Sequence, residues 1–329
     1  MKKILIAIVA VFALVFPLFA CKSGPVEGLV KVYMPNGAPA LAMAKLMHDN
    51  NQFLTNDVTN RTVEYNVVAT GDISIPVIQK EAGLALLPIN TASLIAVDGK
   101  NYKMISVNTH GNLYIIGTGT ATTLDGLKGE KVGVVNLANV PGITFRVILE
   151  KAGISYVTDG SIPKANEISL VAIDGTEVAQ RLKSDLKYVL APEPAVTTVT
   201  TKAVLEANIL MDIQTLYGGD YPQAVLLARI DVYKDTQFIN AVLAALEENI
   251  SWLDGNIANA VSAINANLVP GVTESITAAN LNGAVIANCN IKVVLAKDAK
   301  AQVNDYIAKI RALNISPAPA LELKNAFFG

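Results

Sequence analysis

Short apolar strands alternate along this chain with segments long enough to form helices. The first hundred residues hold three predicted strands, each followed by a predicted helix; the strands are Leu29–Met34, Val63–Val68 and Leu84–Pro88. This alternation is typical of α/β folds built on mostly parallel sheets. Because the carboxyl ends of parallel strands meet at one edge of a sheet, where open α/β sheets bind ligands, we expect the loops after these strands to lie together.

The same alternation continues in a second set of elements that starts near Leu124. Its predicted strands are Lys131–Asn136, Ser169–Ala172 and Tyr188–Leu190, and its predicted helices are Gly142–Ala152, Thr176–Lys183 and Ala195–Leu205. Long helices follow in the last hundred residues. A Gly-Thr repeat at 117–120, and Gly218, Gly219 and Pro222 at 218–222, mark the two places where the sets join. We therefore predict a two-lobed α/β clamshell with residues 29–117 and 223–329 in lobe 1, residues 118–222 inserted as lobe 2, and a hinge of two chain crossings.

The N-terminus has the pattern of an export signal. Two lysines precede an apolar run from Ile4 to Ala20, and residues 18–21 read Leu-Phe-Ala-Cys. This ending resembles the lipobox of bacterial lipoproteins, which implies cleavage after residue 20 and a diacylglycerol on Cys21. Residues 21–28 then form a tether. The alternative is an uncleaved membrane anchor, although Pro17 interrupts the run. Both interpretations place the remaining chain outside the cytoplasm.

Composition limits the classes of function. A formal net charge of -2, with no basic stretch and no acidic tail, argues against nucleic-acid binding and against a disordered tail. Apart from Cys21 the chain has one cysteine, Cys289, which we interpret as a buried apolar residue. A core, and not disulfides, is therefore expected to stabilise the fold.

Polar residues that follow the predicted strands are candidates for ligand contact. Asn36 with Gly37, Thr70, Asn90 with Thr91, and Asn136 all lie at strand ends. Asn at such a position often only caps a helix. The convergence of several of these turns on one edge favours a site.

The turn Pro141-Gly142-Ile143-Thr144 is a second kind of candidate. Free N–H groups at the start of the following helix, with the Thr144 hydroxyl beside them, suit an anionic or strongly polar group. The alternative is that Gly142 and Thr144 only begin and cap this helix.

Charged and aromatic residues leave further alternatives open. Glu193, held between two prolines at a strand end, is predicted to face the cleft, or else to cap a helix or pair with a cation. Tyr221 either faces the cleft or packs, and His110 lies before a strand that leads into the hinge. Arg146 and Arg229 could clamp a carboxylate or sulfonate, or be ordinary surface charges. The expected cleft is polar and neutral more than cationic, and both a planar heterocycle and a small oxoanion remain open as solutes.

Four stretches together carry a family resemblance. They are Pro35-Asn36-Gly37-Ala38-Pro39-Ala40-Leu41-Ala42, Leu87-Pro88-Ile89-Asn90-Thr91-Ala92, Gly111-Asn112-Leu113-Tyr114 and Ala191-Pro192-Glu193-Pro194-Ala195. In this order, and with the lipobox, they resemble type II periplasmic substrate-binding proteins, in particular NMT1/THI5-like lipoproteins of the sulfonate, nitrate or taurine type. The resemblance implies use of the Gly142 and Thr144 turn and of Glu193 in the cleft.

The resemblance also implies a function. A solute would enter the cleft, the lobes would close, and the closed form would deliver the solute to an ABC transporter permease, without catalysis or a cofactor. Part of the same family resembles a pyrimidine-precursor synthase, which needs a cysteine-rich site that this chain lacks. A lipid-anchored scaffold or adhesin is a third interpretation, but the sequence has no repeats or long polar stalk.

Overall fold

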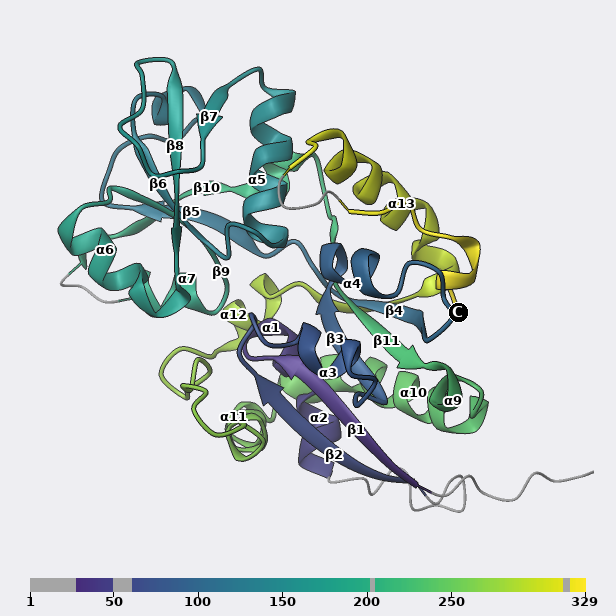
Figure 1. The fold of residues 1–329 in the computed structure, drawn as a ribbon. Helices are drawn as coiled ribbons and strands as arrows, with labels where there is room; N and C mark the ends of the chain where they lie inside the picture. Colours follow the sequence, from purple (N-terminus) through teal and green to yellow (C-terminus); the bar gives the residue numbers. More distant parts are fainter. Residues whose placement is uncertain (1–27, 50–60, 202–204, 316–319) are drawn as a thin grey trace, which may run out of the picture.

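A computed structural model describes residues 28–49, 61–201, 205–315 and 320–329 of the chain. The predicted signal peptide, Cys21 and nearly all of the tether lie outside these residues. Two six-stranded sheets, each flanked by helices, form the two halves of the molecule (Figure 1). In the described ranges, no helix combines the length and the apolar character that a bilayer crossing requires.

The first sheet has the strand order β12-β4-β11-β3-β1-β2. Its strands are β1 (Gly28–Pro35), β2 (Arg61–Val68), β3 (Leu84–Pro88), β4 (Tyr102–His110), β11 (Pro222–Arg229) and β12 (Ile291–Leu295). Its helices are α1 (Ala38–Leu41), α2 (Ala44–Asp49), α3 (Ser74–Ile78), α4 (Ile89–Ile95), α9 (Ile230–Tyr233), α10 (Thr236–Leu253), α11 (Ile257–Ala266), α12 (Gly283–Asn288) and α13 (Ala296–Ala312). Strand β1 runs parallel to β2 and β3, whereas β11 and β12 pair antiparallel with their neighbours.

The second sheet has the order β10-β5-β9-β6-β8-β7. Its strands are β5 (Leu113–Gly117), β6 (Lys131–Val135), β7 (Ser155–Val157), β8 (Glu167–Ile173), β9 (Tyr188–Pro192) and β10 (Asn208–Asp212). Its helices are α5 (Val140–Lys151), α6 (Val178–Ser184), α7 (Ala195–Thr200) and α8 (Ile213–Tyr217). Strands β6, β7, β8 and β9 form parallel pairs. Strand β5 pairs antiparallel with both β9 and β10, and β10 is the edge strand.

The prediction of two α/β halves is confirmed, but the sheets are mixed. Strands β5 and β11, which follow the two crossings, and β12 run antiparallel to the strands beside them. One predicted boundary is corrected. Strand β5 belongs to the second sheet, so the first crossing lies at Gly111–Asn112 and not at 117–120. The second crossing lies between Tyr217 and Pro222. The sequence analysis also missed β4, β7, β10 and β12, whose residues do not alternate with predicted helices.

The two crossings lie side by side. The Gly111 N–H donates to the Tyr221 carbonyl at 3.1 Å, which joins one crossing to the other. A Cβ atom at Gly111 would lie 2.5 Å from the Tyr221 ring, so only glycine permits this approach. The waist between the two halves is therefore two adjacent backbone segments held together by packing.

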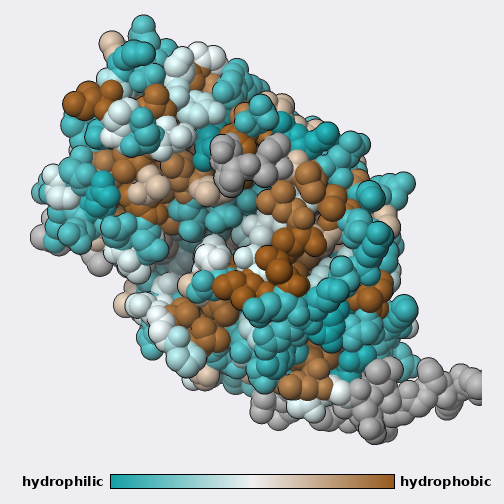
Figure 2. All heavy atoms as spheres, in the orientation of Figure 1, coloured by the Kyte–Doolittle hydropathy of each residue, from teal (hydrophilic) through white to brown (hydrophobic). Residues whose placement is uncertain are grey.

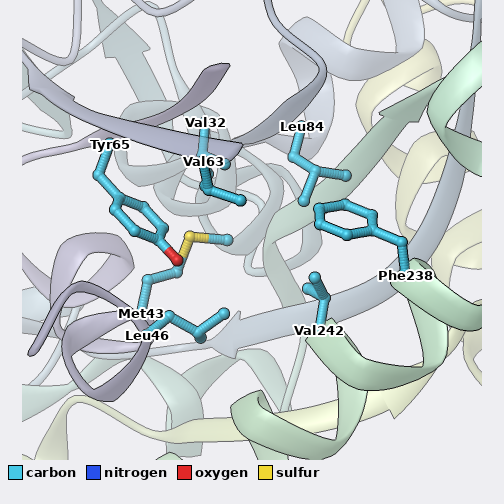
Figure 3. Close-up of a pocket in the computed structure, with 8 residues that line it drawn as sticks. All are labelled: Val32, Met43, Leu46, Val63, Tyr65, Leu84, Phe238 and Val242. Atoms are coloured by element: carbon cyan, nitrogen blue, oxygen red, sulfur yellow. The ribbon is translucent and has the colours of Figure 1, made fainter. Parts of the chain in front are cut away.

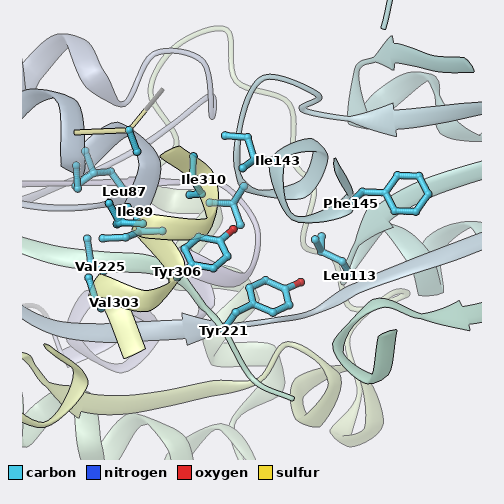
Figure 4. Close-up of a cluster of buried hydrophobic side chains, with 14 of the residues drawn as sticks. Leu87, Ile89, Leu113, Ile143, Phe145, Tyr221, Val225, Val303, Tyr306 and Ile310 are labelled. Atoms are coloured by element: carbon cyan, nitrogen blue, oxygen red, sulfur yellow. The ribbon is translucent and has the colours of Figure 1, made fainter. Parts of the chain in front are cut away.

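The larger of the apolar cores reaches across both sheets. It contains Leu87 and Val225 from the first sheet, Leu113 from the second, and residues of α5 and α13 (Figure 4). In Figure 1, α13 lies beside α5 on the flank of the waist. The back of the molecule is thus packed continuously from one half to the other.

A second core fills the space between the first sheet and helices α2 and α10. Eight of its side chains surround a gap of about 10 Å³, with Tyr65 and Phe238 on either side (Figure 3). A void of this size holds at most one water, and an apolar lining keeps such voids dry. This gap is a packing defect and not a ligand site.

A buried ion pair ties β2 to α10. The Arg61 Nε donates to the Asp235 carboxylate at 2.8 Å, and both side chains are less than a tenth exposed. Asp235 also accepts a hydrogen bond from the Phe238 N–H at the start of α10. Removal of Asp235 would therefore leave a buried guanidinium and an uncapped helix.

We expect Asp235→Ala to lower the free energy of unfolding by about 3–5 kcal/mol, because the buried ion pair with Arg61 is broken and α10 loses its cap. The measurement is chemical denaturation. Asp231→Ala is the matched control: Asp231 pairs with Arg229 at 2.7 Å and is more than half exposed, so about 1 kcal/mol or less should be lost. Equal losses in the two variants would contradict the assigned role of the buried pair.

Candidate functional site

A cavity of about 830 Å³ lies between the two halves of the molecule. In the view of Figure 2 the surface is indented between the upper and lower halves, near where Figure 1 shows α7 facing α1 and α12. Both sheets contribute to its lining. The volume is in the range of small-molecule sites.

Five of the sequence-predicted residues line this cavity. They are Asn36 and Gly37 after β1, Thr70 after β2, Asn136 after β6, and Glu193 after β9. Each follows the carboxyl end of a strand that lies in a parallel ladder of its own sheet. Strand ends of this kind share one edge within each sheet, and the cavity is lined from both edges.

Asn36 lines the cavity and has one buried acceptor without a partner among the described residues. Its Nδ2 donates to the Thr273 carbonyl at 2.9 Å, whereas its Oδ1 is buried and has no hydrogen-bond partner among the described residues. Asn136, in the other half, sits in the left-handed region with φ at 56°, which Asn adopts more readily than most residues. Backbone geometry thus explains the choice of Asn at 136, and an open hydrogen bond remains at Asn36.

Glu193 is almost fully buried, with 1% of its surface exposed. Its Oε2 accepts from the Thr197 N–H at 3.0 Å, and its Oε1 accepts from the Thr197 hydroxyl at 2.9 Å and from Asn288 Nδ2 at 3.5 Å. The carboxylate therefore caps the first turn of α7 while it lines the cavity, so two of its predicted roles coexist. No basic side chain of the described residues pairs with it.

One hydrogen bond joins the two halves across the cavity lining. The Nδ2 of Asn280, which comes from the first half, donates to the Thr198 hydroxyl of α7 at 2.8 Å and also to the Ser275 carbonyl. Asn280 and Thr198 both line the cavity. Opposite walls of the cavity are therefore in direct contact at this point.

Sequence reasoning missed three parts of the lining. They are the segment 271–280 between α11 and α12, the turn at Asp174–Thr176 after β8, and Thr198, Val199 and Thr201 in and just after α7. Segment 271–280 follows a helix and not a strand, so the strand-end rule could not find it. Its glycine and its run of hydroxyl residues were the available signal: it reads Gly-Val-Thr-Glu-Ser-Ile-Thr-Ala-Ala-Asn.

The turn at the start of α5 lies outside the cavity, which corrects the prediction for Gly142 and Thr144. The Thr144 hydroxyl is fully buried and shares a 2.6 Å hydrogen bond with the Tyr306 hydroxyl of α13. A Cβ at Gly142 would lie 2.1 Å from the Leu137 carbonyl oxygen, so this glycine is required by packing. The Thr144 hydroxyl at this helix start therefore contacts α13.

Tyr221 belongs to the same packed region. Its ring is fully buried and stacks on Tyr306 with centroids 5.8 Å apart, and its hydroxyl donates to Gln214 at 3.1 Å (Figure 4). Burial raises the pKa of Tyr221 well above its usual value. The packing role left open by the sequence analysis is thus the one that the structure supports.

His110, Asn90 and Thr91 are also absent from the cavity lining. His110 is buried at the end of β4, and burial, with Lys292 nearby, lowers the pKa of its imidazole to about 4. Asn90 Nδ2 donates to Asn139 Oδ1 at 3.4 Å, which is another contact between the two halves. His110 is therefore a neutral side chain next to the waist.

The two predicted arginine clamps lie elsewhere. Arg146 is buried and donates to the Leu137 carbonyl at 2.6 Å, and burial lowers the pKa of its guanidinium. Arg229 donates to Asp231 and to the Lys80 carbonyl at the far end of β11. Neither guanidinium lines the cavity.

Solved structures of sulfonate-binding proteins share this fold of two α/β halves around a cleft. No protein-family model and no curated protein sequence matches the chain. An ABC transporter protein from Parabacteroides distasonis is similar in structure, with a TM-score of 0.67 and 18% identity over 92% of this chain and 98% of that one.

Two alkanesulfonate-binding proteins are similar as well. The aliphatic sulphonate binding protein SsuA of Escherichia coli has a TM-score of 0.63 and 13% identity over 89% of both chains. SsuA of Xanthomonas axonopodis pv. citri, bound to MOPS, has a TM-score of 0.61 and 13% identity over 90% of this chain and 97% of that one. At these identities the likeness establishes the fold.

We expect Thr144→Val to lower the free energy of unfolding by about 1–3 kcal/mol, because the buried Tyr306 hydroxyl loses its partner. Solute affinity should stay unchanged. Thr200→Val is the control, since the Thr200 hydroxyl donates only to the Val196 carbonyl of its own helix. Denaturation and binding curves test both variants, and a loss of affinity without a loss of stability would return Thr144 to the site.

Proposed function

We propose that this protein is an extracytoplasmic solute-binding protein that captures a small molecule between its two halves and delivers it to an ABC transporter permease. The observation that carries the proposal is the cavity of about 830 Å³ shared by strand-end loops of both sheets. The fold, common to binding proteins for ABC-type import, supports the same function.

The lining favours capture over catalysis. Its polar groups are hydroxyls, amides and carboxylates, and the one buried carboxylate, Glu193, is engaged by Thr197. In the described part of the chain, no three His, Cys, Asp or Glu side chains gather as a metal site would require. Cys289 is buried beside the waist, where burial raises its thiol pKa. Such groups hold a solute through hydrogen bonds without activating a nucleophile.

Closure on a solute should depend on the bond between Asn280 and Thr198. We expect a low-molecular-weight fraction of complex growth medium to raise the melting temperature of the purified protein, since a ligand at 100 times its Kd adds about 2.7 kcal/mol of stability. Thr198→Val should weaken this binding about fivefold, the worth of one net hydrogen bond. Thr200→Val, on the same helix but outside the lining, is the matched control. Absence of stabilisation in the unmodified protein would contradict capture.

Anchoring by lipid is the second part of the proposal. It is supported by the Leu-Phe-Ala-Cys ending of the apolar N-terminal run. We expect Cys21→Ser to abolish incorporation of radiolabelled fatty acid and to shift the protein from the detergent phase to the aqueous phase of a detergent partition. Cys289→Ser serves as the control and should keep its label. A labelled Cys21→Ser variant would exclude lipidation at this residue.

A further inference from the structure

All charged side chains among the described residues that line the cavity are acidic. They are Asp174, Glu193 and Glu274, and no Lys, Arg or His of the described residues joins them. Two of the acidic residues come from the second half and one from the first. A solute between them is therefore surrounded by negative charge on both walls.

The Glu193 carboxylate is the buried member of this acidic set, so its hydrogen bonds bear on which solute the cleft can hold. A carboxylate removed from water is costly unless it is paired or fully hydrogen-bonded. Its two oxygens have about four acceptor positions. Three of these are occupied, by bonds from the Thr197 N–H, the Thr197 hydroxyl and Asn288 Nδ2. One position on Oε2 remains for a donor.

Asn36, like Glu193, has an acceptor that still needs a hydrogen-bond donor. Its buried Oδ1 is an acceptor without a donor among the described residues. Sulfonate and nitrate groups offer only acceptors and a negative charge. They would leave Asn36 Oδ1 unsatisfied and would be repelled by Glu193, whereas a protonated amine satisfies both groups.

The lining also restricts the kind of cation. Within the described residues it contains no Phe, Tyr or Trp, so it offers none of the aromatic faces that recognise quaternary ammonium groups. Its hydroxyl and amide groups, contributed by residues such as Thr70, Asn136 and Thr277, instead suit a solute that bears several polar groups.

We propose that this cleft binds a small cationic solute that carries N–H donors, an aliphatic amine or amidine, and not a sulfonate. The inference rests on the proposed capture function and specifies its substrate class. Glu193 would receive an N–H at the buried wall, Asn36 Oδ1 would receive another from the opposite half, and Asp174 and Glu274 would draw the cation in from the rim. The alkanesulfonate-binding proteins thus share the fold, while the charge in this cleft selects the opposite sign.

The test divides the low-molecular-weight fraction of growth medium by ion exchange at pH 7 into cationic, neutral and anionic portions. The cationic portion should raise the melting temperature of the purified protein, and the anionic portion should not. Stabilisation by the anionic or neutral portion alone would support capture but overturn this inference. If no portion stabilises the protein, capture itself fails, and the inference fails with it.

Two variants connect the charge preference to these residues. Glu193→Gln should reduce affinity for the cationic portion about tenfold to a hundredfold, the effect of losing one charged hydrogen bond. Glu274 is exposed, and no hydrogen bond or ion pair is described for it. Glu274→Gln should therefore lower the affinity only a few-fold, and this loss should shrink as salt is added. Glu322→Gln, exposed and outside the lining, should bind normally.

Unchanged affinity in both cleft variants would overturn the inference. The melting temperature of each variant without solute shows whether it folds. If Glu193→Gln does not fold, Glu274→Gln still tests the inference. A chelator arm separates amines from metal ions: stabilisation that disappears with chelator would identify the cation as a metal and overturn the amine assignment.

Discussion

The fold depends on the contact between the two chain crossings. Because Gly111 has no side chain, its N–H can reach the Tyr221 carbonyl, and the passages into and out of the second half run together. Two adjacent backbone segments can change their dihedral angles with little loss of packing, unlike a broad interface. The waist therefore allows the halves to move while keeping their strand ends opposed.

Contacts on either side of this waist have different characters. At the back, Tyr306 of α13 packs against Tyr221 and shares a buried hydrogen bond with Thr144 of α5, within an apolar core common to both halves. Across the cleft, the halves meet through polar bonds such as that between Asn280 and Thr198. Buried apolar packing is costly to separate, whereas polar contacts near solvent exchange readily with water. Opening is thus expected at the cleft, with α13 and α5 remaining packed.

The sequence was sufficient to predict two α/β halves and part of the cavity lining. Asn36, Gly37, Thr70, Asn136 and Glu193 were found because each follows a strand end, and strand ends converge by a general rule of parallel sheets. The segment 271–280 was missed because it connects two helices and reaches the cleft only through the tertiary fold.

The residues that were misplaced show the limit of local patterns. A helix start such as Gly142 to Thr144 offers free N–H groups in any orientation, and whether it faces a cleft or another helix is decided by packing far away in sequence, here by Tyr306. Arg146 and Tyr221 were ambiguous for the same reason. The position of β5 was also set by its partners β9 and β10, which local sequence does not reveal.

Closure of the two halves about the double crossing is the central claim, and a distance measurement between them tests it most directly. Spin labels at Asp72→Cys and Gln180→Cys, both exposed and on opposite halves, report the separation by pulsed electron resonance. The account predicts a broad, longer distribution in the empty protein that narrows and shortens when the stabilising portion of growth medium is added. A single distribution, unchanged by that addition, would contradict it.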